Sequence, residues 1–157
     1  MRKRNVVIWI LLAIVIALVL FIFSNSLKNS ETSKRDSDFI VDIVSPIVEK
    51  IIGYVPENIG LIVRKLAHFT EFCFLGAAAF ALAKSLNGRF KSSVYGYALF
   101  GVLAVAVTDE FIQSFSDRGS AVSDVLIDLG GALCGFFACL IFVVLHKKSE
   151  NKKIEKE

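Results

Sequence analysis

The sequence contains a run of nineteen residues without a charge, at positions 5–23, and this run sets the class of fold. A helix of roughly 20 largely apolar residues crosses the ~30 Å hydrocarbon core of a bilayer. Arg2, Lys3 and Arg4 precede the run, as basic residues precede a signal peptide's apolar core. The run is longer than such a core, which has about 7–15 residues, and no clear small-residue cleavage site follows it. We therefore expect an uncleaved first membrane span.

Three further apolar stretches follow, at residues 66–86, 94–115 and 122–145. Hydrophobic residues make up 55% of the 157 residues, so an ordinary soluble domain is excluded. We expect an all-α polytopic integral membrane protein whose four spans form a transmembrane bundle, in a single membrane domain over residues 1–157. The three cysteines, at positions 73, 134 and 139, lie inside the spans without disulfide spacing, and we expect them to be buried by packing.

Basic residues are distributed unevenly between the two ends of the predicted spans. The chain start, the connection at residues 84–91 and a charged tail at 147–157 together carry eleven of the 18 basic residues and three of the 15 acidic ones. The opposite side carries the other seven basic and twelve acidic residues. Because cytoplasmic loops are enriched in Lys and Arg, we expect both termini in the cytoplasm, with the tail solvated.

A long external segment separates the first two spans. Residues 28–37 are polar, and we expect a loop there. Residues 38–52 contain apolar doublets spaced by four, which is the period of an amphipathic helix. Pro46 is expected to kink or divide this helix. We expect it to lie in the outer interface or to cover the bundle; the alternative is a poorly formed fifth span.

Ionisable residues occur where the apolar stretches begin and end on the outer side. Charge at membrane depth is costly and commonly marks a functional site. On helices, His68 and Glu71 can meet, and Asp109 and Gln113 share a face. Arg64 shares the face of His68, although an interfacial anchor is an equal alternative for it. The candidate site residues are Lys65, His68, Glu71, Asp109, Glu110, Gln113, Arg118, Asp124 and Asp128.

Asp124 and Asp128 are four residues apart, and Gly131 and Gly135 continue the same stripe in a GxxxG spacing. Glycines at this spacing allow a neighbouring helix to approach closely. The face that carries the two acids is therefore also the face expected to pack. This places the carboxyl groups inside the bundle rather than in lipid.

The outer cluster carries more negative than positive charge. Three basic residues face five acidic ones when Asp117 is left aside as a solvated turn residue, which leaves a net charge of −2. Protonated carboxyls, a charged His68, a bound cation or a cationic ligand group would offset it. One histidine with several carboxylates can hold a hard divalent ion, but no compact ligand motif such as HExxH is present.

These residues also form a recognisable pattern. The motif Lys65-x-x-His68-Phe69-x-Glu71-Phe72, then Asp109-Glu110-x-x-Gln113-x-Phe115-x-x-Arg118, then Asp124-x-x-x-Asp128-x-x-Gly131-x-x-x-Gly135 resembles that of the VanZ-like family of bacterial membrane proteins. The Phe23-Ser24-Asn25-Ser26 end of the first span is similar to that family's aromatic-serine exit, except that Asn25 departs from the usual serine pair. The resemblance covers the chain from the first span to the last.

The resemblance implies a protein of the bacterial cytoplasmic membrane, related to a founding member associated with low-level resistance to the glycopeptide antibiotic teicoplanin. The resemblance implies that the nine candidate positions match the family's motif positions, but it does not assign their roles. The expected partners are membrane lipids and a lipid-linked envelope precursor or glycopeptide, and no nucleic acid. Neither a cofactor nor an oligomeric state follows from it.

Three roles for the cluster stay open. An enzyme at the outer leaflet would hold an anionic headgroup with Lys65 and Arg118, and would use His68, oriented by Glu71, with Asp109 or Glu110 as base and acid. Asp124 and Asp128 would then orient these groups or hold a cation. A non-catalytic binding protein would use the same residues as contacts, and a structural network would only hold the helices together. A transporter is disfavoured because the charges cluster at one depth.

Overall fold

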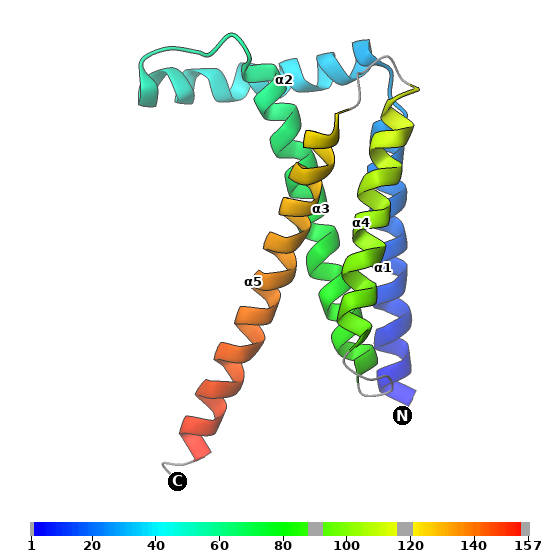
Figure 1. Ribbon diagram of the computed structural model, residues 1–157. Coiled ribbons are helices and arrows are strands. Elements are labelled where there is room, and N and C mark those ends of the chain that lie inside the picture. Colours follow the sequence, from blue (N-terminus) through cyan, green and yellow to red (C-terminus); the bar gives the residue numbers. More distant parts are fainter. Residues whose placement is uncertain (1, 88–92, 116–120, 155–157) are drawn as a thin grey trace.

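The computed structural model describes residues 2–87, 93–115 and 121–154, and within these ranges it contains α-helices and no strands (Figure 1). The helices are α1 (Arg2–Ser26), α2 (Ser30–Ile52), α3 (Ile59–Asn87), α4 (Ser93–Gln113) and α5 (Val122–Ile154). Four of them, all except α2, are long and apolar enough to cross a membrane. The all-α class and the four predicted apolar spans are therefore confirmed.

Three of the spans are longer than the sequence predicts, and two of them extend by seven residues or more at one end. Helix α3 begins at Ile59 rather than at residue 66, and α5 continues to Ile154 rather than ending at residue 145. Most of the tail predicted at residues 147–157 is therefore helical. The sequence contains no Gly or Pro between residues 136 and 154, and its Lys and Glu residues favour helix, so nothing ends the helix where the apolar stretch ends.

The segment between the first two spans contradicts the predicted loop and the predicted division of the helix at Pro46. The polar residues 28–37 are not a loop, because α2 begins at Ser30. The Asn29 side chain caps it by accepting a 2.9 Å hydrogen bond from the backbone N–H of Thr32. Pro46 does not divide α2, which continues to Ile52. Pro46 removes only one backbone bond, and the helix ends where Gly53 adopts a φ of 82°.

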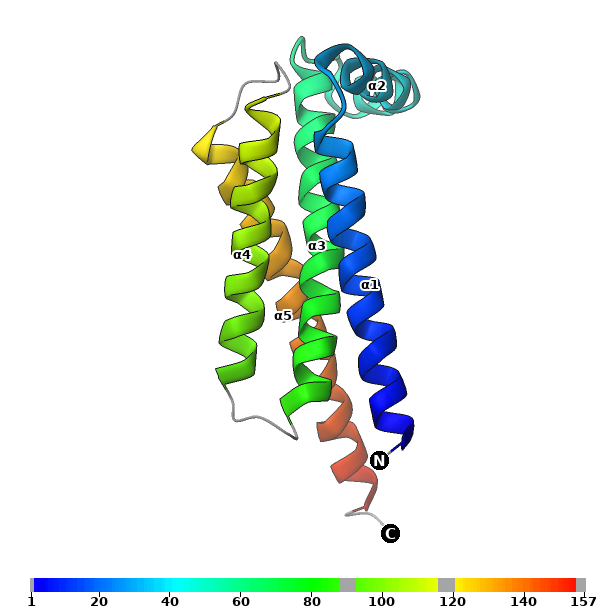
Figure 2. The ribbon, with the colours of Figure 1, turned by 90° about the vertical axis from the view of Figure 1, so that its right-hand side faces the viewer.

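Helix α3 is central and contacts each of the other four helices (Figure 2). Helix α2 lies across one end of the molecule, where it contacts α3 (Figure 1). The end of α1, the start of α3, the end of α4 and the start of α5 lie toward the same end. The start of α1 and the end of α5 lie at the opposite end. All three polar segments singled out from the sequence therefore lie toward the end that carries α2.

Glycines bring the backbones of α3 and α5 into direct contact. A Cβ atom added at Gly131 would lie 2.2 Å from the carbonyl oxygen of Phe69, and one at Gly135 would lie 1.9 Å from that of Cys73. Gly76 of α3 makes the reciprocal contact, since its Cβ would lie 2.0 Å from a backbone oxygen of α5. The predicted packing role of Gly131 and Gly135 is confirmed.

The buried core lies beside the polar segments. Its most buried apolar side chains come from α1, α3, α4 and α5, and they include Ile22, Phe72, Leu75, Ala106 and Ala132. Large apolar side chains cover much of the outer surface, which suits contact with lipid.

Cys134 is exposed and the other two cysteines are half-buried, so the prediction of buried packing is wrong for Cys134.

Candidate functional site

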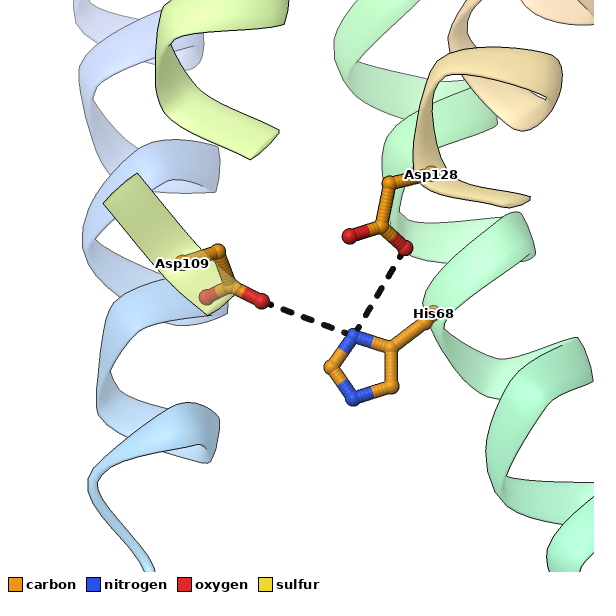
Figure 3. A group of neighbouring side chains, drawn as sticks. All are labelled: His68, Asp109 and Asp128. Carbon is orange, nitrogen blue, oxygen red and sulfur yellow. Dashed lines mark ion pairs between the residues drawn. The ribbon is translucent and has the colours of Figure 1, made fainter. Parts of the chain in front are cut away.

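The site is centred on His68, whose imidazole reaches from α3 toward carboxylates on two other helices. Its Nδ1 atom lies 3.7 Å from Oδ2 of Asp109 on α4 and 3.9 Å from Oδ1 of Asp128 on α5 (Figure 3). Asp109 is 0% exposed and Asp128 is 1% exposed. The fold thus brings together one imidazole and two buried carboxyl groups that are 41 and 60 residues away from it in sequence.

Hydrogen bonds hold Asp109 from both sides. The hydroxyl of Ser26, at the end of α1, donates a 2.6 Å bond to Oδ1. The Gln113 amide, one turn further along α4, donates a 2.8 Å bond to Oδ2 and a 3.3 Å bond to the Ser26 hydroxyl. All three residues are buried, so the carboxylate orientation is fixed. Ser26 was absent from the sequence-based set, although its place in the span exit was a signal for it.

Asn25, next to Ser26, also belongs to the site. Its side-chain amide donates a 2.8 Å hydrogen bond to Oε1 of Glu71 on α3. A serine hydroxyl is both donor and acceptor, whereas the Asn amide supplies two N–H donors on a longer side chain. Asn25 therefore supplies a hydrogen-bond donor to Glu71.

The remaining acids have separate partners. Lys65 forms an ion pair with Asp124 between the first turns of α3 and α5, so this lysine and this aspartate offset each other. Glu110 accepts a 2.6 Å hydrogen bond at Oε1 from the backbone N–H of Ala121. Its other oxygen, Oε2, is buried and accepts no hydrogen bond from the described residues.

Arg118 lies outside the described residues, so the structure does not place it. Arg64 shares the predicted helix face of His68 but is not one of the nine candidate residues. It is half-buried and lines two cavities. It makes no ion pair with the residues that the structure describes. Within the described part of the chain, Arg64 is therefore a cation of the site that has no carboxylate in direct contact.

A half-open polar cavity of about 180 Å³ lies between α1, α2 and α3. Its polar lining includes Asn25, Lys28, Asp36, Arg64, His68 and Glu71. Lys28 and Asp36 pair at 2.8 Å on its rim, and the Lys28 ammonium holds the pKa of Asp36 below its ordinary value of 3.8. The cavity lining carries positive and negative side chains. Its lysine, Lys28, is paired with Asp36, whereas its arginine, Arg64, has no carboxylate partner among the described residues.

An apolar groove of about 530 Å³ lies beside the polar cavity, between the same three helices. The two share four lining residues, namely Ile40 of α2 and Val63, Ala67 and Glu71 of α3. Its outer wall includes Phe21, Leu66 and Phe74, which are all more than half exposed. A polar cavity therefore adjoins an apolar groove along a predicted membrane span.

The fold and the site define a multi-pass membrane protein with a cluster of ionisable side chains on its spans. The VanZ/LLP1 family model matches residues 8–143. The chain therefore belongs to the VanZ/LLP1 family, as its motifs predict. No curated protein and no solved structure gave a significant match.

Proposed function

We propose that this protein acts at the outer face of the bacterial cytoplasmic membrane on an amphipathic molecule of the cell envelope, such as a lipid or a lipid-linked precursor. The polar cavity takes the headgroup and the apolar groove takes part of the hydrocarbon chain. The observation that carries the proposal is the shared wall of the two spaces, formed by Ile40, Val63, Ala67 and Glu71. A ligand that fills both must have a polar and an apolar part.

The charges around the cavity favour an anionic headgroup. Lys28 is paired with Asp36, and Lys65 is paired with Asp124. Among the described residues that line the cavity, this leaves the guanidinium of Arg64. A guanidinium binds phosphate or carboxylate through two parallel N–H donors. We assign to Arg64 the role that the sequence suggested for Lys65 and Arg118. His68 faces the same cavity, where it contacts the headgroup or, in a catalytic version of the proposal, transfers a proton.

The proposal places α2 and the site outside the cell and both termini in the cytoplasm. The excess of basic residues at the opposite end supports this orientation. Phe39, Ile43, Ile47 and Ile51 of α2 are all exposed, which suits a helix lying in the outer interface. In a cysteine-free background, a single cysteine replacing the exposed Ser30 should react with an impermeant thiol reagent in intact cells; protection there with reactivity in lysed cells would reverse the orientation.

The ligand is tested by the lipids that the protein retains. The full chain is purified in mild detergent as wild type, as Arg64→Gln and as Arg35→Gln, and bound lipids are measured by mass spectrometry. Arg35 is an exposed arginine of α2 that does not line the cavity, so it controls for the loss of one positive charge. Anionic species should be retained by wild type and Arg35→Gln and lost from Arg64→Gln. Equal retention by all three would refute the headgroup assignment.

Family membership supports a link to low-level teicoplanin resistance, with the envelope precursor or the glycopeptide itself as the ligand. We test this link by expressing the protein in a teicoplanin-sensitive host and replacing His68 and Glu71 one at a time by Ala and Gln. Reduced resistance with normal folded yield would support a site acting on such a molecule. Wild-type protein without any effect on susceptibility would separate this chain from the resistance role.

A structural role is favoured by a different observation. Side-chain hydrogen bonds join Asn25 to Glu71 and Ser26 to Asp109 across helices, and such bonds hold spans together. In this alternative the polar cluster only stabilises the fold. Loss of folded yield in every variant, together with no retained lipid in wild type, would favour it over ligand binding.

A further inference from the structure

Three side chains from three helices converge on one point beside His68. One possible ligand atom each from His68, Asp109 and Asp128 lies within 4.8 Å of the other two (Figure 3). Two ligands of one ion, each about 2.1 Å from it, lie about 3 to 4 Å apart. The Nδ1-to-oxygen separations of 3.7 and 3.9 Å are within this range, whereas they are too long for direct hydrogen bonds.

A second observation comes from Glu110. This residue is 6% exposed, and its Oε2 atom is buried without a hydrogen bond from the described residues. Glu110 lines a small cavity of about 10 Å³ together with His68 and Asp128. Arg64 and the ion-paired Lys65 and Asp124 line it too. A cavity of about 10–15 Å³ accommodates a single water molecule, and so it also accommodates one small cation. A buried carboxylate oxygen without a donor beside this cavity points to a positively charged occupant.

The surroundings of Asp109 are those of a metal ligand. Carboxylates that bind metals are themselves oriented by outer hydrogen bonds. Ser26 donates to Oδ1 of Asp109 and Gln113 donates to Oδ2. The nearby Lys65 does not offset the charge of these acids, because it is paired with Asp124. Among the described residues, the two buried aspartates and Glu110 thus outnumber the basic groups other than Lys65 at this cavity, which are the imidazole of His68 and the guanidinium of Arg64.

We infer that His68, Asp109 and Asp128 bind one divalent transition-metal ion, with Glu110 as a further carboxylate ligand. Imidazole nitrogen suits Zn²⁺ and Fe²⁺, and carboxylate oxygen suits Mn²⁺, so a mixed set of this kind selects a first-row ion. His68 also lines the polar cavity, so the ion lies one side chain away from the proposed headgroup site. The inference does not rest on the proposed function, because metal binding requires no lipid.

The test is direct metal binding by the untagged full chain in detergent, after chelation and dialysis. Zn²⁺ is titrated calorimetrically, bound metal is counted by mass spectrometry, and Mn²⁺ is followed by electron paramagnetic resonance. Wild type should bind one ion per chain. Asp128→Asn and His68→Gln should each weaken binding by about tenfold or more, and Gln113→Ala, which loses an outer hydrogen bond, by about tenfold.

Two variants serve as matched controls. Glu150→Gln removes the same charge at an exposed residue further along α5, away from the cavity. His146→Gln removes the other histidine of the chain, which is exposed far along α5. Both should bind within about threefold of wild type. Wild-type protein without saturable binding would overturn the inference, even if the ligand variants fail to fold. Unchanged affinity in folded Asp128→Asn and His68→Gln would also overturn it.

Discussion

The hydroxyl of Ser26 donates a 2.6 Å hydrogen bond to the carboxylate of Asp109, and this bond connects the end of α1 to α4. Both side chains are fully buried. The bond fixes the carboxylate that faces His68 on its other oxygen. The first span therefore takes part in the site through its last turn, next to the point where α2 begins.

Ser26→Ala should destabilise the protein, because the buried Asp109 oxygen loses a donor. Leaving a buried polar group without its partner costs about 1–3 kcal/mol. Ser24→Ala is the matched control, because the Ser24 hydroxyl is exposed and bonds only to a backbone oxygen in its own helix. Unfolding in detergent, followed by circular dichroism, should show a lower midpoint for Ser26→Ala and a near-native midpoint for Ser24→Ala. Equal midpoints would contradict the role of this bond.

Gly135→Ala should disrupt the packing of α3 against α5. Its added methyl group would lie 1.9 Å from the Cys73 carbonyl oxygen, so the two helices must separate. Overpacking costs typically about 1–3 kcal/mol and more where backbone is displaced. Gly101→Ala provides the control, since nothing lies within 4 Å of its added Cβ and Ala favours helix. If Gly135→Ala were as stable as Gly101→Ala, the close contact between Gly135 and the Cys73 backbone would be contradicted.

Reversing the charge of either Lys65 or Asp124 should weaken the contact between the first turns of α3 and α5. Lys65→Glu places two like charges together, and Lys65→Glu with Asp124→Lys restores an opposite pair. The two side chains are 32% and 27% exposed, so solvent reduces the expected coupling to about 1 kcal/mol. A double-mutant cycle on unfolding measures it. A coupling of zero would indicate that the pair does not form.

The ion pair between Asp36 and Lys28 should persist over the physiological pH range and keep the Lys28 ammonium group on Asp36. Lys28 lowers the pKa of Asp36 below 3.8, so the pair's contribution is present above that ordinary value and is lost as pH falls through the lower folded-state pKa. Retention of anionic lipid should therefore not change between about pH 5 and 8 through this pair. Asp36→Asn should free Lys28 to face the polar cavity and raise that retention at neutral pH. Reduced retention in Asp36→Asn would contradict the proposed headgroup charge.

The sequence predicted the elements whose signals are periodic or compositional. The uncharged run at residues 5–23 predicted α1, and the acid-glycine stripe from Asp124 to Gly135 predicted the packed face of α5. Membrane thickness and helical period determine both features. The glycine of α3 that approaches α5, Gly76, is harder to find, because it lies in a run of small residues with no charge beside it.

Helix ends and ion-pair partners are harder to predict from the sequence. The start of α2 was missed because polar residues of a surface helix resemble a loop until the Asn29 cap is considered. The sequence predicted that Lys65 and Arg64 lie at the same end of the molecule. It did not show which of the two would form an ion pair with an acidic residue. Pairing depends on side-chain direction across helices, and only the structure shows that Lys65 meets Asp124 while Arg64 lines the cavity.

The junction between the polar cavity and the apolar groove is the central feature of this account, and Ala67 lies in it. Ala67 lines both spaces and is exposed, so Ala67→Trp should fill the junction without disturbing the core. Ala104→Trp is the control, because Ala104 of α4 is also exposed and lines neither space.

The most direct measurement is native mass spectrometry of the wild-type protein and these two variants, released from nanodiscs that contain phosphatidylglycerol and phosphatidylcholine. The account predicts retained phosphatidylglycerol on wild type and Ala104→Trp, and its loss from folded Ala67→Trp. Equal retention of phosphatidylglycerol by all three proteins would contradict it.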